Sequence, residues 1–305
     1  MLTVYPDYYK KFACKKEKCQ HNCCIGWEID IDEQKLDYYT SVSGEIGEKL
    51  KANISLEPIP HFTLDKNERC PFLNKDNLCE LIINLGPDSL CSICDLHPRF
   101  QNELPQRTEI GLGLCCEAAA ELIIGNRDKV LLVENEKSDD QIITLRDKII
   151  SVLQDRSLDT DKRIEIMLNL CNTDFKFSYR YFDLFLSLER LDQRWTELLE
   201  TVKNNYTKLN FKDFDAYITG REYEYEQFLV YLIYRHFANS ADLYSAASKA
   251  KFAALAYYLV RSIAVLIFQR KGEFSFDNQI DVMRMFSAEI EYSDENLYEI
   301  FDFLI

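Results

Sequence analysis

The second half of the chain carries apolar residues at spacings of three and four, with charged residues between them. This pattern is typical of amphipathic helices packed around a core. The predicted helices span residues 142–154, 161–171, 179–191, 194–204, 222–237, 243–270, 276–289 and 295–303. No period of about 34 or 40 residues repeats along them, so the pattern favours an irregular α-helical bundle over a solenoid.

The first third of the chain has shorter apolar runs, separated by polar turns. Asp32 is a suitable N-cap for a helix that runs to about Leu50. Gly86-Pro87 is expected to end a short helix over residues 80–85, and a further helix is expected over residues 117–124. The predicted fold is therefore mostly α, with a Cys-rich, loop-rich N-terminal module packed on the helical bundle.

The distribution of cysteines is the clearest indication that the chain has two domains. Ten of the eleven cysteines lie between Cys14 and Cys116, and only Cys171 lies beyond. The N-terminal residues have neither the apolar run nor the cleavage site of a signal peptide. We therefore expect a cytoplasmic protein, in which reduced thiols bind soft metal rather than form disulfides. A polar stretch at residues 134–141 is the expected boundary between a Cys-rich metal-binding module, residues 1–135, and a helical domain, residues 136–305.

Two further spacings are typical of metal ligands. Cys70 and Cys79 flank a polar turn, which would bring their thiols together in a knuckle. Cys91 and Cys94 have the C-x2-C spacing, which metal sites share with thioredoxin-like redox pairs, and metal is favoured because no βαβ pattern surrounds them. The four histidines are isolated or lie in loops, where a structural role is more common than ligation.

The acidic composition limits the partners that the chain can have. A net charge of -15 argues against nucleic-acid binding, which requires a basic surface. An acidic surface would attract a basic partner, although it also serves simple solubility. The apolar run at residues 252–268 is interrupted by Arg261 and is shorter than a membrane span, so we expect a buried helix and no membrane anchor.

The first cysteine cluster ends in a Gly-Trp and an alternating apolar and acidic run. Adjacent Cys23 and Cys24 are expected to point apart in extended backbone and to serve different partners. The motifs in chain order are Cys14-x4-Cys19-x3-Cys23-Cys24-Ile25-Gly26-Trp27-x-Ile29-x-Ile31-Asp32, Cys70-Pro71-Phe72-Leu73, Leu78-Cys79 and Cys94-x2-His97-Pro98-Arg99. Together they resemble the flagellin lysine N-methylase family, and more distantly the zinc- or iron-chelating bacterial proteins named for a CxxCxxCC signature.

The resemblance implies an enzyme that transfers methyl groups from S-adenosylmethionine to lysine side chains of flagellin, with cysteines that hold an iron-sulfur cluster. Zinc is the alternative metal. The resemblance matches seven thiols directly, and the segment Leu114-Cys115-Cys116-Glu117 looks like the family's Cys-Pro-Glu. With Cys91 added from its spacing, the predicted metal ligands are Cys14, Cys19, Cys23, Cys24, Cys70, Cys79, Cys91, Cys94 and Cys115.

The chain departs from the family pattern in places. His97 stands where the family has an aromatic residue, and Cys91 and Cys116 are additional thiols. One four-iron cluster or one structural zinc takes four cysteines. Nine candidate ligands therefore mean either two metal sites, or one site with several further thiols that lie near it without binding the metal.

The sequence shows no ordinary binding site for the methyl donor. Gly111-Leu112-Gly113 is a weak match to a nucleotide-binding turn, and the radical-type C-x3-C-x2-C motif is missing. Tyrosines and phenylalanines of the second half could line a slot for a lysine side chain, but aromatic residues at helical spacing are more often core, and no catalytic base is named. Two alternatives remain: a non-enzymatic zinc- or iron-binding protein, and a redox-sensing interaction protein that uses Cys91 and Cys94.

Overall fold

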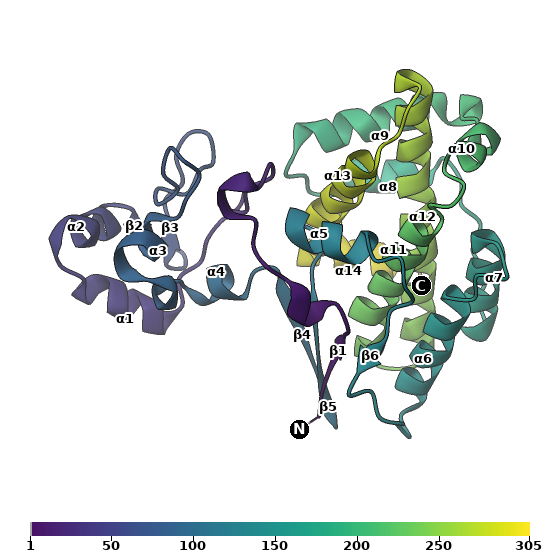
Figure 1. Ribbon diagram of the computed structural model, residues 1–305, viewed down its shortest axis with the longest axis horizontal. Coiled ribbons are helices and arrows are strands. Elements are labelled where there is room, and N and C mark those ends of the chain that lie inside the picture. Colours follow the sequence, from purple (N-terminus) through teal and green to yellow (C-terminus); the bar gives the residue numbers. More distant parts are fainter. Residues whose placement is uncertain (1) are drawn as a thin grey trace. The chain divides into compact units, whose positions relative to one another are not determined.

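The expected helical character is confirmed. The computed structural model describes residues 2–305, of which 57% are helical, in fourteen α-helices over that described range (Figure 1). The chain divides into two compact units. Unit 1 combines the residues up to Phe12 with Gln101–Ile305, and unit 2 is Ala13–Phe100.

Unit 1 contains a four-stranded sheet that the sequence patterns did not predict. Its order is β4 (Arg99–Leu104), β5 (Arg107–Leu112), β1 (Leu2–Pro6) and β6 (Leu132–Val133). β1 pairs in parallel with β5 and antiparallel with β6. This pairing makes the first residues of the chain part of unit 1. The compact units therefore divide after residues 12 and 100, which differs from the expected boundary at residue 135.

The helices of unit 1 follow the predicted pattern closely. They are α5 (Glu117–Ile124), α6 (Gln141–Leu153), α7 (Thr160–Leu170), α8 (Tyr181–Ser187), α9 (Gln193–Asn205), α10 (Phe211–Tyr217), α11 (Tyr223–His236), α12 (Leu243–Lys271), α13 (Phe276–Phe286) and α14 (Asp294–Phe303). Only α10 was not predicted, because its seven residues are too few to show helical periodicity. α13 ends earlier than expected, because the chain continues as a π-helical turn, Ser287–Glu291.

α12 is the central helix of unit 1. It packs against α7, α9, α10, α11, α13 and α14, and Figure 1 shows it running through the middle of these helices. Most of its residues between Phe252 and Leu266 are buried, which confirms the buried helix expected there. Among residues 2–305 it is the one helix that is long and apolar enough to cross a membrane. However, 72% of its apolar window is buried inside the protein, as in the core helix of a globular unit.

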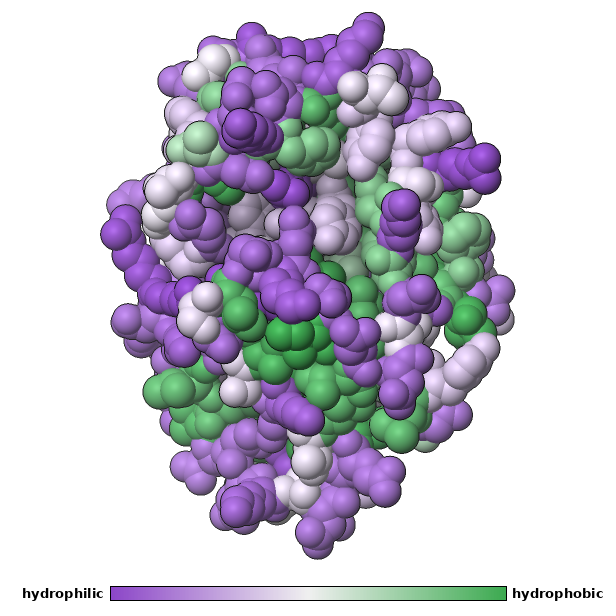
Figure 2. All heavy atoms as spheres, turned by 90° about the vertical axis from the view of Figure 1, so that its right-hand side faces the viewer, coloured by the Kyte–Doolittle hydropathy of each residue, from purple (hydrophilic) through white to green (hydrophobic). Residues whose placement is uncertain are grey.

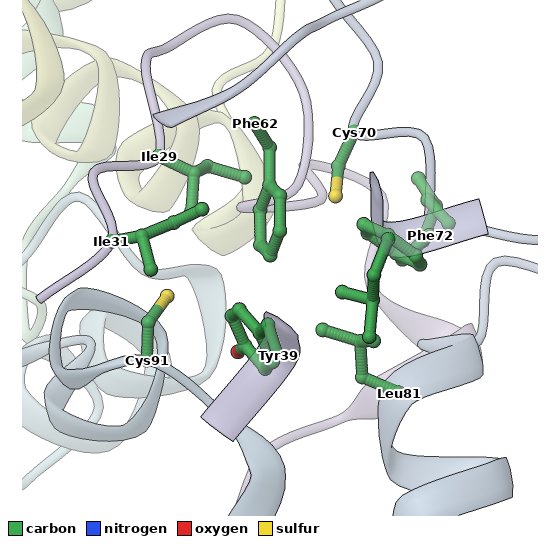
Figure 3. Close-up of a cluster of buried hydrophobic side chains, with 10 residues drawn as sticks. Ile29, Ile31, Tyr39, Phe62, Cys70, Phe72, Leu81 and Cys91 are labelled. Carbon is green, nitrogen blue, oxygen red and sulfur yellow. The ribbon is translucent and has the colours of Figure 1, made fainter. Parts of the chain in front are cut away.

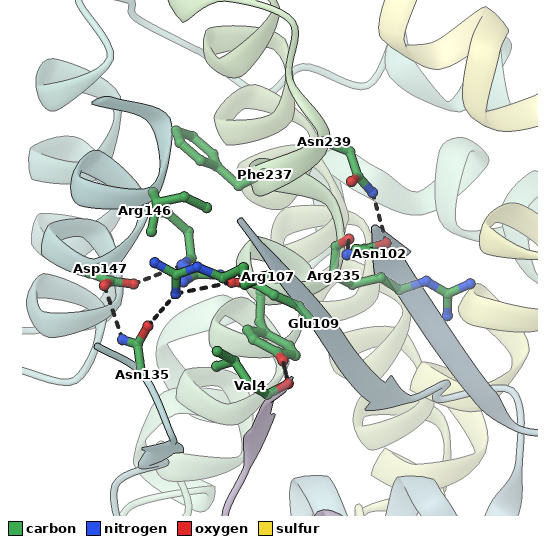
Figure 4. A network of polar contacts seen from close by, with 12 residues as sticks. Val4, Asn102, Arg107, Glu109, Asn135, Arg146, Asp147, Arg235, Phe237 and Asn239 are labelled. Carbon is green, nitrogen blue, oxygen red and sulfur yellow. Dashed lines mark hydrogen bonds and ion pairs between the residues drawn. The ribbon is translucent and has the colours of Figure 1, made fainter. Parts of the chain in front are cut away.

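Buried charges join the sheet of unit 1 to its helices. Arg146 on α6 and Glu109 on β5 are both fully buried, and 2.6 Å separates Nη1 from Oε2 (Figure 4). Arg146 Nε donates to Asp147 at 2.8 Å. The Tyr234 hydroxyl of α11 donates to the Val4 carbonyl of β1 at 3.0 Å. Because a buried charge is costly without its partner, these contacts fix how β1 and β5 lie on α6 and α11.

Unit 2 consists of short elements joined by loops. They are α1 (Glu33–Ser41), α2 (Gly44–Ala52), β2 (Ile54–Ser55), β3 (His61–Phe62), α3 (Glu80–Leu85) and α4 (Ser92–Leu96). The single helix expected over residues 33–50 is two helices, because the chain bends after Val42 and Gly44 adopts a φ of +79°. At Gly47, an added Cβ would lie 2.2 Å from the Val42 carbonyl oxygen, so glycine allows α2 to approach the end of α1.

Asp32 caps α1 as predicted and also holds the start of α4. Its Oδ1 accepts a hydrogen bond from the backbone nitrogen of Lys35 at 3.1 Å. Its Oδ2 accepts hydrogen bonds from the backbone nitrogen and the hydroxyl of Ser92, at 2.8 and 2.9 Å. One carboxylate therefore fixes the first turns of two helices.

We expect Asp32→Ala to lower the free energy of unfolding of unit 2 by about 1–2 kcal/mol, because it removes an N-cap and a second anchor. Denaturant unfolding followed by circular dichroism measures this loss. Asp37→Ala, at an exposed position of the same helix, is the matched control and should change stability by less than about 0.5 kcal/mol. Equal losses in the two variants would show that the Asp32 contacts contribute nothing.

Candidate functional site

The first cysteine segment of unit 2 is bound to the segment that carries Cys70. Ile25 and Arg69 form an isolated antiparallel bridge. On one side of it the Cys70 backbone nitrogen donates to the Cys24 carbonyl at 2.8 Å, and on the other the Gly26 nitrogen donates to the Glu68 carbonyl at 3.0 Å. Gly26 has a φ of +94°, which favours glycine at this turn. The bridge places Cys24 beside Cys70, although 46 positions separate them in the sequence.

The knuckle expected between Cys70 and Cys79 is confirmed. Leu73 and Cys79 form an antiparallel bridge across the turn. Asn74 Oδ1 closes the turn by accepting hydrogen bonds from the backbone nitrogens of Asp76 and Leu78, each at 2.9 Å. The polar turn therefore returns the second cysteine toward the first, as its composition predicted.

Cys91 and Cys94 begin α4. Cys91 is the N-cap residue, and the Cys94 backbone nitrogen donates to its carbonyl at 3.0 Å. The two thiols also share a hydrogen bond, which lowers the pKa of Cys91 and raises that of Cys94. Asp32 fixes this helix start from α1, so the pair is held in place on two sides.

Five thiols of unit 2 converge on one apolar core. Cys70 and Cys91 are buried in it beside Ile29, Tyr39 and Phe62, and Figure 3 shows both sulfur atoms pointing toward these side chains. The other three, which are partly buried, pack against the same core: they are Cys24, Cys79 and Cys94. The core of unit 2 is therefore also the place where its cysteines meet.

Burial and neighbouring thiols control the protonation of this cluster. Burial, together with the charges of Cys79 and Cys91, raises the pKa of Cys70 to about 11 against the opposing effect of backbone hydrogen bonds. A hydrogen bond with Cys23, followed by burial, raises the pKa of Cys24. These thiols are protonated when nothing is bound, and a metal would have to displace their protons.

The expectation for Cys23 and Cys24 is wrong in one respect. The two residues lie in a turn, not in extended backbone, because the Ile25 backbone nitrogen donates to the Asn22 carbonyl at 3.2 Å. Their thiols approach each other and share a hydrogen bond. Cys23 therefore joins Cys24 at the edge of the cluster.

The remaining predicted ligands lie elsewhere in the chain. Cys14 is exposed, and its Sγ accepts a hydrogen bond from the Lys16 backbone nitrogen at 3.4 Å. The Cys19 thiol donates to the His21 carbonyl at 3.2 Å. Cys115 belongs to unit 1. The six cysteines that unit 2 brings together are Cys23, Cys24, Cys70, Cys79, Cys91 and Cys94.

The thiols of unit 2 have the ligand types of a metal or cluster site. No three His, Cys, Asp or Glu side chains within residues 2–305 come close enough to form a finished metal site. However, five thiols of unit 2 share one apolar core, and Cys23 lies at its edge beside Cys24. Thiolates in an apolar shell are the donors that zinc and iron-sulfur clusters prefer. The chemistry of the donor set therefore fits such a group.

Unit 1 contains a buried polar network that sequence reasoning missed. Its centre is the Glu291 carboxylate, which ends the π-helical turn after α13 and is fully buried. The Tyr231 hydroxyl donates to Glu291 Oε2 at 2.9 Å, and 2.6 Å separates His236 Nε2 from Oε1. Arg235 Nη1 donates to the Tyr231 hydroxyl at 2.7 Å. Sequence spacing could not show this network, since about 55 residues separate Glu291 from His236.

The segment that carries Cys115 lies against this network. The Leu114 backbone nitrogen donates to the Tyr231 hydroxyl at 3.2 Å. Burial raises the pKa of Cys115, and a hydrogen bond with Tyr292 opposes this effect. At Gly113, an added Cβ would lie 2.1 Å from the Tyr292 hydroxyl. The glycine that weakly suggested a nucleotide-binding turn is therefore needed for close packing against Tyr292.

The network should make unit 1 sensitive to acid. Burial lowers the pKa of His236 below its ordinary value of 6.5, so the folded protein holds this ring neutral. When folding lowers the pKa of a group, the contribution of that group to the free energy of unfolding is complete at pH values above the pKa of the unfolded state. This contribution is lost as the pH falls below that value. Although burial raises the pKa of Glu291, the charge of Arg235 and the hydrogen bond with His236 bring it below 4.5, so its contribution is lost at still lower pH.

We expect the free energy of unfolding of unit 1 to fall between about pH 7 and about pH 5, and to fall less in His236→Gln, which cannot take up the proton. Urea unfolding at several pH values measures both slopes. His21→Gln, in a loop of unit 2, is the control and should keep the wild-type slope. Equal slopes in wild type and His236→Gln would contradict the assignment of the effect to His236.

Comparison with known proteins gives matches to the helical part of the chain. Residues 172–305, which contain α8 to α14, match the model of the FliB lysine N-methylase C-terminal domain. Arg235, His236 and Glu291 therefore lie inside the matched region. Sequence reasoning had placed its family motifs in the cysteine segments and had found none in this region.

Curated relatives match over less than half of the chain. The flagellar biosynthetic protein FliU of Salmonella muenchen is 26% identical over 150 residues, which are 45% of this chain and 85% of that protein. The lysine-N-methylases of Salmonella choleraesuis and Salmonella typhimurium are each 25% identical over 147 residues. These residues are 44% of this chain and only 35% of each lysine-N-methylase, so the match spans about a third of their length. No solved structure matches the chain at a significant level.

Proposed function

We propose that the chain, which matches the FliB lysine N-methylase C-terminal domain over residues 172–305, transfers methyl groups from S-adenosylmethionine to lysine side chains of flagellin. The match to the lysine N-methylase C-terminal domain is the observation that carries this proposal. The relatives named as lysine-N-methylases support the reaction, and the relative named as a flagellar biosynthetic protein supports a flagellar substrate. The cysteine motifs agree with the same family.

The proposed reaction is a direct displacement. The neutral ε-amine of lysine attacks the methyl carbon of the sulfonium, so that a nitrogen-carbon bond forms while the sulfur-carbon bond breaks. The electron pair of the broken bond stays on sulfur, and S-adenosylhomocysteine leaves. The lysine ammonium gives its proton to solvent before the attack, and the product is the methylated ammonium. The protein must hold the amine deprotonated and in line with the methyl group, which requires a site that excludes water.

We further propose that four of the six thiols that unit 2 brings together hold an iron-sulfur cluster, with zinc as the alternative. The donor types and the apolar shell support this assignment. A bound cluster would supply a rigid thiolate-ligated centre with the capacity to exchange one electron. The chain's own contribution is structural: Asp32, the Ile25–Arg69 bridge and the Asn74 turn place the thiol-bearing segments around one core.

The acidic charge of the chain supports a lysine-bearing substrate in the cytoplasm. A net charge of -15 favours encounter with basic surface residues and raises association rates at low salt. The net charge therefore acts on the encounter with the substrate and takes no part in methyl transfer.

Co-expression with flagellin tests the proposal. The chain is produced in a host whose flagellin carries no methyl-lysine, and flagellin peptides are mapped by mass spectrometry. We expect methyl-lysine only in cells that produce the chain. Flagellin that stays unmethylated beside a folded, soluble chain would contradict the proposed function.

A further inference from the structure

A cavity of about 650 Å³ opens in unit 1 between the loop that joins α6 to α7, the end of α10, the start of α11 and the middle of α12. Figure 2 views the protein from the side on which α7 and α10 lie, where hydrophilic and hydrophobic residues are mixed over the surface. The volume lies in the range of pockets that hold small molecules and cofactors.

Tyrosines form part of the cavity wall. Tyr225 and Tyr257 meet edge to face, with ring centroids 5.5 Å apart, and Tyr223 lines the cavity beside them. Tyr225 is only 3% exposed, and its hydroxyl is buried without a hydrogen-bond partner. An unpaired buried hydroxyl is costly, so a native protein normally has a reason to keep it. Burial raises the pKa of Tyr225, which keeps the hydroxyl protonated and able to donate.

Arg261 adds a cation with unused donors. It binds the Asp215 carboxylate through Nη2 alone, at 2.5 and 2.6 Å, and its guanidinium lies 5.8 Å from the Tyr257 ring centroid. Within the described residues, its Nη1 and Nε make no further hydrogen bond. A guanidinium with free donors beside a cavity is suited to receive a carboxylate.

The cavity also has carboxylates that form no ion pair within the described residues, although the charge of Arg261 acts on one of them, Asp161. Glu226 is paired with both Arg156 and Arg163, at 2.9 Å each. By contrast, Asp161 accepts a hydrogen bond only from the Tyr258 hydroxyl, and Glu222 accepts one from the Gly220 backbone nitrogen. Five acids and three arginines line the cavity, so its formal charge is -2. The cavity therefore favours a ligand with a net positive charge and also offers one site for an anion.

We propose that this cavity binds S-adenosylmethionine, an inference that rests on the proposed lysine methylation. The donor carries an adenine and a sulfonium that can lie on tyrosine faces, an ammonium and a ribose diol that carboxylates recognise, and a carboxylate that suits Arg261. A lysine side chain alone is a slender apolar chain with one cation, and it would leave most of the cavity and the free donors of Arg261 unused.

Calorimetric titration of the purified chain with S-adenosylmethionine tests the proposal without relying on activity. We expect Tyr225→Phe to raise the Kd by about tenfold, since one hydrogen bond to the ligand is lost. Its thermal midpoint should equal or exceed that of wild type, because the change removes only an unpaired hydroxyl. Arg261→Lys keeps the positive charge but loses the planar guanidinium, which can donate two parallel hydrogen bonds to a carboxylate. This variant should weaken binding of the donor to a similar degree. Tyr298→Phe, at an exposed position on α14, is the matched control and should bind like wild type.

The outcomes separate this inference from the proposed function. Unchanged donor affinity in both cavity variants would overturn the assignment, and so would a wild-type chain that does not bind the donor. Binding of Nα-acetyl-lysine amide in place of the donor, weakened in Tyr225→Phe, would also overturn it and make the cavity the acceptor site. Flagellin methylation by wild type is measured in parallel: a raised donor KM with an unchanged kcat in Tyr225→Phe supports the inference. Methylation with wild-type kinetics in that variant would refute donor binding in this cavity, and it would agree with the proposed function.

Discussion

The variant Cys24→Ser, Cys70→Ser, Cys94→Ser should lose its bound metal. It leaves only Cys23, Cys79 and Cys91 of the six thiols that unit 2 brings together, which is fewer than the four ligands that one zinc or one four-iron cluster takes. After anaerobic purification, we expect the content of iron, zinc and acid-labile sulfide to fall by about tenfold or more relative to wild type. Elemental analysis and the visible spectrum measure this loss.

The control for this result removes thiols that lie in unit 1. Cys116→Ser with Cys171→Ser changes two cysteines that were never predicted as ligands, and Cys171 is buried by α7. This double variant should keep the metal content of wild type. If the triple variant also keeps it, the thiols of unit 2 do not hold the metal.

The second large effect concerns Glu291. We expect Glu291→Gln to lower the free energy of unfolding of unit 1 by about 3–5 kcal/mol, since it removes the buried carboxylate that pairs with Arg235. The Arg235 side chain is only 12% exposed, so solvent cannot replace the lost carboxylate. Urea unfolding followed by tryptophan fluorescence measures the change, because Trp195 lies in the core of unit 1.

Glu295→Gln is the matched control for that change. It makes the same substitution at an exposed position of α14 and should alter stability by less than about 0.5 kcal/mol. A Glu291→Gln variant as stable as the control would show that the network around Arg235 does not hold unit 1 together.

Much of the helical architecture could be predicted from local patterns. Helices such as α6, α7 and α12 were found because their apolar periodicity extends over eleven or more residues. The Cys70–Cys79 knuckle was found because its turn chemistry is also local. Both kinds of signal depend on neighbouring residues and do not require the partner surface to be known.

Features that depend on distant partners could not be predicted. β1 is a strand because it pairs with β5, about one hundred residues later, and five residues alone show too little alternation. The same limit hid the convergence of Cys24 on Cys70 and the Glu291 network. The break between α1 and α2 was not predicted, because its position depends on how α2 packs against Val42.

The most direct test of the central claim is methyl transfer in a purified reaction. The anaerobically purified chain is incubated with flagellin and S-adenosylmethionine that carries an isotopically labelled methyl group, and labelled lysines are mapped by mass spectrometry. We expect labelled methyl groups on flagellin lysines, and we expect them only when both the chain and the methyl donor are present. Flagellin that remains unlabelled in the presence of a folded, metal-loaded chain would contradict it.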